Sequence, residues 1–96
     1  MASARGTLGK VLRRLGDLEG ARAEHGQALA IYEAQYGPNG PEVGASRANL
    51  GLVLRGLGDL EGARTELEEA VAILAANDPD DSRIRDVRSL LEDLHH

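Results

Sequence analysis

An eight-residue segment of the chain occurs twice without a change. Leu-Gly-Asp-Leu-Glu-Gly-Ala-Arg stands at residues 15–22 and again at 57–64, a displacement of 42 residues. Over the longer stretch 7–31, 17 of 25 positions are identical to those of 49–73. A period of this length is typical of repeat proteins, in which each unit buries its apolar face against its neighbour. The sequence therefore predicts a stack of repeated units within one small domain.

Apolar residues recur at helical spacing in both copies. In the first copy they are Leu8, Val11, Leu12 and Leu15, and this spacing places them on one face of a helix. Gly16 favours the end of that helix, and Asp17 favours the start of the next one as its N-cap. Residues 37–41 and 77–81 are rich in Gly, Pro, Asn and Asp and interrupt the longer helices. We therefore predict an all-α chain of five helices.

The two units share small residues at matching positions. Each has a Leu-Gly pair in its first helix, a Gly-Asp turn, and alanines in its second helix: Leu8-Gly9, Leu50-Gly51, Ala21, Ala28, Ala63 and Ala70. In these features the chain resembles tetratricopeptide repeat proteins. The period of 42 and the run Ala-Leu-Ala-Ile-Tyr-Glu at 28–33 are similar to the kinesin-light-chain type. Repeats of that type are abundant in high-GC bacteria, and the composition suits such an origin.

The resemblance implies a right-handed α-solenoid of antiparallel helix pairs. Repeat 1 is expected at about residues 3–36, repeat 2 at about 41–76 and a C-terminal capping helix at about 82–94. All 96 residues then form a single domain, either as a whole protein or as an excerpt of a longer or engineered one.

The resemblance also implies a concave groove that binds peptides and is lined by the first helix of each unit. Its expected lining residues are Lys10, Arg13, Arg14, Asn49, Leu52 and Arg55. The formal charge is +4 over residues 1–15, −3 over 17–36 and −4 over 59–76, so the groove layer is basic. Arginine binds carboxylates through paired hydrogen bonds, which favours an acidic peptide or a free C-terminal carboxylate. The alternative is that the layers neutralise each other through weak intramolecular ion pairs.

Two of these residues resemble parts of a known ligand clamp. Asn49 resembles the asparagine that holds the ligand backbone in this repeat type, although an asparagine there could equally bond a neighbouring helix, and Lys10 and Asn49 are at most fragments of the clamp. The complete clamp for chaperone tails has two lysines and two asparagines. Asp86 and Leu90 stand where the third unit would need basic groups, so chaperone tails are not the expected ligand.

Self-assembly is the alternative function, through uncapped repeat ends or through exchange of helices between copies. An enzyme is not expected, because the sequence has no catalytic set, phosphate loop or metal-ligand spacing. The net charge of −5 argues against nucleic acid, and the absence of a long apolar run argues against a membrane span. Together with the lack of cysteine, these features predict a cytoplasmic protein without a cofactor.

The histidines give no metal motif. His25 stands where the second unit has Leu67, which argues against tight packing of the first unit. We interpret it as a packed or half-exposed residue rather than a ligand, and a half-buried histidine here would make the first unit sensitive to mild acid. The adjacent pair His95-His96 at the end of the chain does not define a metal site.

Overall fold

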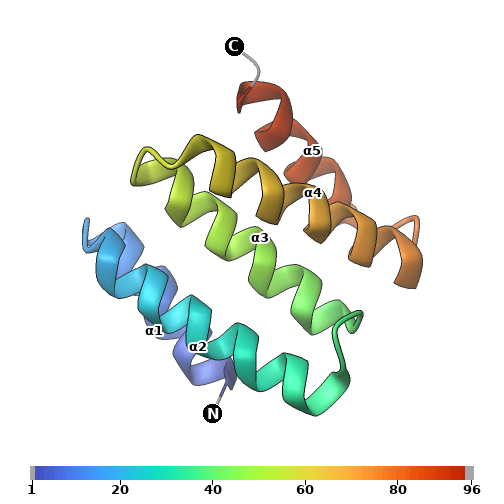
Figure 1. The fold of residues 1–96 in the computed structure, drawn as a ribbon, viewed down its shortest axis with the longest axis horizontal. Helices are drawn as coiled ribbons and strands as arrows, with labels where there is room; N and C mark the ends of the chain where they lie inside the picture. The colour runs from blue at the N-terminus through green and yellow to red at the C-terminus, as the bar shows by residue number, and fades with distance from the viewer. Residues whose placement is uncertain (1, 95–96) are drawn as a thin grey trace.

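Five helices pack side by side in the order of the chain (Figure 1). The computed structural model describes residues 2–94, in which the helices are α1 (Ala2–Arg14), α2 (Leu18–Tyr36), α3 (Pro41–Gly56), α4 (Leu60–Asn77) and α5 (Ser82–Leu94). Each helix contacts the next one along the chain, and α1 also reaches α3. No strand occurs among the described residues. The predicted all-α helical-repeat fold is therefore confirmed.

The repeated Leu-Gly-Asp sequence forms the same corner in both units. Gly16 has φ of +89° and Gly58 has φ of +88°, a left-handed conformation that glycine adopts without the steric cost of a side chain. The Asp17 amide donates to the Leu12 carbonyl over 2.8 Å, which closes the C-terminal turn of α1. The Asp17 side chain then accepts a hydrogen bond from the Gly20 amide over 2.9 Å and caps α2. One short sequence thus ends one helix and begins the next.

Two glycines allow the helices of each pair to approach closely. A Cβ on Gly51 would lie 2.7 Å from the Leu67 Cγ, and a Cβ on Gly9 would lie 2.8 Å from the His25 Nε2. Both distances are shorter than ordinary van der Waals contact, so a side chain at either position would push the helices apart. The sequence predicted these glycines within helices, and the structure gives their reason.

The main core lies on both sides of α3. One cluster joins Leu29 of α2, Val43 of α3 and Ile73 of α4. A second cluster joins Leu67 and Ala70 of α4 to Val87 of α5. The central helix pair is therefore covered on both flanks, by α2 on one side and by α5 on the other.

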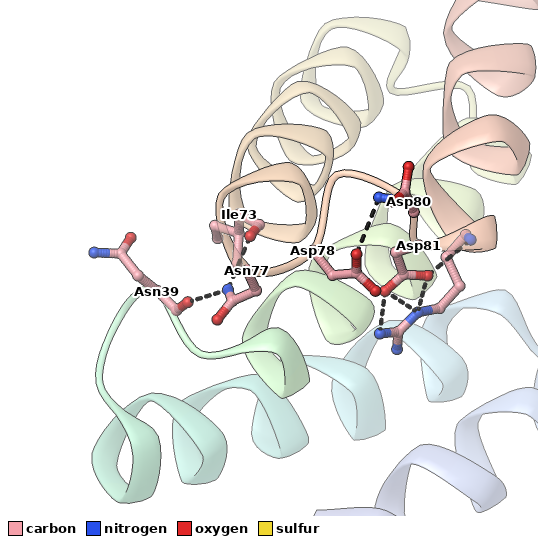
Figure 2. Close-up of polar contacts among 7 residues, drawn as sticks. Asn39, Ile73, Asn77, Asp78, Asp80 and Asp81 are labelled. Carbon is pink, nitrogen blue, oxygen red and sulfur yellow. Dashed lines mark hydrogen bonds and ion pairs between the residues drawn. The ribbon is translucent and has the colours of Figure 1, made fainter.

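The loop between α2 and α3 is joined to the end of α4 by one side chain. Figure 2 shows Asn77 between the two backbone carbonyls that its amide binds. Its Nδ2 donates to Asn39 over 2.8 Å and to Ile73 over 2.9 Å. These bonds fix the loop before α3 against the end of α4.

Candidate peptide-binding groove

A cavity of about 430 Å³ opens on the face formed by α1, α3 and the start of α5. Its lining includes Thr7, Lys10, Tyr32, Glu42, Asn49 and Arg83. Of these, only Tyr32 comes from a second helix of a unit, α2. The cavity therefore lies on the layer of first helices, where the resemblance implied a groove.

Helical spacing explains why Lys10 and Asn49 meet at this cavity. Thr7 and Lys10 are three residues apart on α1, and Ala45 and Asn49 are four apart on α3, so each pair shares a face. Thr7 is also the counterpart of Asn49, 42 residues earlier. The repeat thus presents the same face of both helices to one hollow.

Two cationic side chains border the cavity, and they differ in whether a carboxylate of the protein already binds them. The Arg83 guanidinium binds Asp81, with its Nη2 2.6 Å and its Nε 3.0 Å from the carboxylate oxygens. These hydrogen bonds hold the pKa of Asp81 below its ordinary value. Lys10 takes part in no ion pair among the described residues. The lysine is therefore the cation that a bound anion would meet without first breaking a salt bridge.

Four of the six expected lining residues lie outside the cavity: Arg13, Arg14, Leu52 and Arg55. Arg55 instead stands 3.8 Å from Asp93 of α5. Arg13 lies close enough to His25 to act on its charge. The arginines are thus partly engaged within the molecule, in the manner of the alternative interpretation of the charge pattern.

The lining residues that were not predicted from the sequence include Tyr32, Glu42 and Arg83. Arg83 occupies the position of Glu42 at an offset of 41 residues. The weak third repeat therefore relates these two residues and could have indicated that both lie at the groove. Tyr32 reaches the cavity from α2, and its contribution depends on how α2 is rotated against α3. No local pattern in the sequence specifies that rotation.

His25 is buried beside Gly9, with 1% of its surface exposed. It fills the space that Leu67 fills beside Gly51 in the second unit. The expectation of a loosened contact at this position is therefore wrong, because the glycine makes room for the ring. Burial, and then the charges of Lys10 and Arg13, hold the pKa of His25 below its ordinary value of 6.5, while Glu24 acts in the opposite direction.

The buried imidazole predicts a stability that falls in mild acid. Below pH 6.5 the unfolded chain takes up a proton on His25 before the folded chain does, so the free energy of unfolding decreases from there down to the lower folded pKa. Replacing His25 with leucine is expected to remove this decrease and to add about 1 kcal/mol at pH 7. Urea unfolding of both proteins between pH 8 and pH 5 measures the difference. Parallel pH curves would contradict the assignment to His25.

The fold defines a class of protein, the all-α helical-repeat proteins. Within this class, the family model of the tetratricopeptide repeat matches residues 1–76. The chain belongs to the tetratricopeptide repeat family, and proteins of this family mediate protein–protein interaction as scaffolds. No curated protein matches the chain.

Residues 2–94 contain neither a membrane-spanning helix nor a cluster of metal ligands. None of the described helices combines the length and the apolar character that crossing a bilayer requires. No three described His, Asp or Glu side chains are grouped so that they could hold a metal ion. The pair His95-His96 lies outside the described residues.

Proposed function

We propose that the protein is a non-catalytic scaffold that binds an acidic peptide or partner helix in the cavity between α1, α3 and α5. The observation that carries this proposal is that Lys10, which forms no ion pair within residues 2–94, lines the same cavity as Asn49. An ammonium attracts a carboxylate, and a carboxamide both donates to and accepts from a peptide backbone. The two side chains together supply what an acidic extended segment needs.

The position of the other charges limits the ligand. Glu42 borders the cavity and lies close enough to Arg83 to act on its charge. An anionic ligand group therefore binds at the Lys10 side, away from Glu42. Tyr32 and Ala45 offer apolar contact at the same wall. A peptide that carries one carboxylate next to an apolar side chain fits this arrangement better than a highly charged one.

The test is a titration of a fluorescein-labelled peptide, Ser-Leu-Glu-Leu-Ser with an amidated C-terminus, by fluorescence anisotropy. The change Lys10→Glu is expected to weaken binding about tenfold, because it replaces an attractive charge contact by a repulsive one. Asn49→Ala is expected to weaken it about threefold through the lost backbone hydrogen bond.

The matched control is Arg14→Glu. It makes the same change of charge on the same helix, but Arg14 lies outside the cavity. It is expected to weaken binding by less than about twofold, through screened long-range attraction alone. Equal losses in Lys10→Glu and Arg14→Glu would mean that the peptide senses only the net charge of α1, and the groove would not be its site.

Self-assembly through the repeat ends is the second candidate function. At the C-terminal end, the exposed residues of α5 include Arg85, Arg88 and Glu92. In the repeat alignment, at an offset of 41 residues, they correspond to the residues of α3 that face α4. This end is therefore charged where another helix would have to pack. The exposed apolar surface is at the other end, on α1.

A further inference from the structure

The outer face of α1 is apolar and open to solvent. Leu8, Val11 and Leu15 are 46%, 45% and 77% exposed. They are spaced by three and four residues and so form one stripe along the helix, which we term the α1 edge. Leu8, Val11 and Leu15 do not line the cavity, although Thr7, which does, stands four residues before Val11. The α1 edge is thus a second surface that borders the groove.

The same stripe exists in the second unit, where it is covered. Leu50, Val53 and Leu57 are the counterparts of the α1 edge residues, 42 positions later, with no change of residue type. Val53 is completely buried and Leu57 is half-buried. Leu50 packs against the cluster that contains Leu29 of α2, and Tyr32 of α2 packs against the same cluster. One molecule therefore contains both the covered and the uncovered form of this surface, and α2 takes part in covering it.

The charged residues beside the stripe also differ between the two units. Arg47 of α3 binds Glu66 of α4 over 3.0 Å and also faces Glu33 of α2 over 3.7 Å. Its counterpart Arg5 binds Glu24, the counterpart of Glu66, over 3.3 Å. The Arg5 side chain is 42% exposed, against 17% for Arg47. The carboxylate that Glu33 supplies to Arg47 thus has no equivalent beside Arg5 among the described residues.

We propose that the α1 edge binds an acidic amphipathic helix of a partner protein, in the manner in which α2 covers α3. The pattern that it recognises is the one of Leu29, Tyr32 and Glu33: two apolar side chains three residues apart, followed at once by a carboxylate. Apolar contact with Leu8 and Val11 supplies burial, and the carboxylate completes the surroundings of Arg5.

A second copy of the chain fits the edge less well than such a partner. The edge of another copy brings another α1, and residues 1–15 carry four cations and no acid, so two of these helices repel each other. The opposite end of another copy presents the charged residues Arg85, Arg88 and Glu92 of α5. The helix that complements the edge is α2, and in each copy α2 is already engaged with α3.

The probe is a labelled synthetic peptide of residues 18–40, which carries α2 and its C-terminal loop, titrated with the full chain by fluorescence anisotropy. We expect saturable binding that Val11→Asp weakens at least tenfold. Leu60→Asp is the matched control, because Leu60 is 48% exposed, close to the exposure of Val11, but lies on α4. This control is expected to bind as the unchanged protein does.

A charge exchange tests the recognition of the carboxylate. Arg5→Glu in the protein is expected to weaken binding about fivefold, and a peptide with Glu33→Arg is expected to restore it. Absence of saturable binding, or an equal loss in Val11→Asp and Leu60→Asp, would overturn the proposal. Sedimentation of the chain alone supplies the remaining comparison. If the chain formed a concentration-dependent dimer and Val11→Asp restored the monomer mass of 10.2 kDa, the edge would bind a second copy. That result would overturn the proposal of a partner helix.

A negative result for the α1 edge can be distinguished from a negative result for the groove of the proposed function. The groove is tested with Lys10→Glu and an extended acidic peptide, whereas the edge is tested with Val11→Asp and a helical one. Val11 does not line the cavity, so a loss confined to one variant and its own peptide identifies the surface concerned.

Discussion

Replacing Leu67 with alanine is expected to lower the free energy of unfolding by about 3 kcal/mol. Leu67 has no exposed surface and belongs to the cluster that joins α4 to α5. Its side chain also fills the space above Gly51 of α3. Removing it opens a cavity at the point where three helices meet, and a small domain has little other core with which to compensate. Urea unfolding followed by circular dichroism measures the loss.

The contact between Leu67 and Gly51 can be isolated by a double-mutant cycle. Gly51→Ala alone is expected to cost about 1–3 kcal/mol, because the new Cβ would lie 2.7 Å from the Leu67 Cγ. In the double variant the added methyl group occupies part of the space that the leucine leaves. The combined loss is therefore expected to be smaller than the sum of the single losses by about 1 kcal/mol.

Gly26→Ala is the control for helix propensity. A Cβ at Gly26 meets nothing within 4 Å, so this change is expected to raise stability by about 0.5–1 kcal/mol. Strictly additive losses at Gly51 and Leu67 would show that the glycine is not needed for the close approach of α3 and α4.

Replacing Arg47 with alanine is expected to lower the free energy of unfolding by about 2 kcal/mol. The Arg47 guanidinium lies 3.0 Å from Glu66 and 3.2 Å from Glu69 on α4, and 3.7 Å from Glu33 on α2. Without the arginine, three carboxylates keep their charges and lose their shared partner. The group is partly shielded from water, so its charge contacts are weakened less by solvent than those of a fully exposed pair.

The repeat provides the control for Arg47. Arg5 occupies the same position in the first unit but makes one salt bridge, over 3.3 Å, with a more exposed side chain. Arg5→Ala is expected to cost less than about 0.5 kcal/mol. Thermal unfolding of the two variants in low and high salt separates the effects. Arg47→Ala is expected to lower stability strongly at both salt concentrations, whereas Arg5→Ala is not. Equal losses would mean that the network contributes no more than one surface pair.

The fold was predictable because its signals are local and occur twice. Gly16 and Asp17 are adjacent in the chain, and the bonds that they make reach only to Leu12 and Gly20. The spacing of the apolar residues then specifies which face of each helix is buried. A repeated sequence doubles every such signal, so the helices and their turns followed from the residues alone.

The groove was predictable only in part because its shape depends on contacts between distant segments. Lys10 and Asn49 line the cavity, whereas Arg55 lies 3.8 Å from Asp93 on α5. That contact joins residues far apart in the sequence, and no spacing rule links them. Tyr32 was missed for the same reason, since the rotation of α2 against α3 brings it to the cavity.

The two Leu-Gly-Asp corners make the 42-residue segment between them a unit that can be copied as it stands. The capping bonds at Asp17 and Asp59 have the same length, 2.9 Å, and the glycines before them have φ values within one degree of each other, +89° and +88°. A gene duplication or an engineered insertion that cuts at these corners joins two ends already in the required conformation. The length of such a protein can therefore change by whole units without the invention of a new turn.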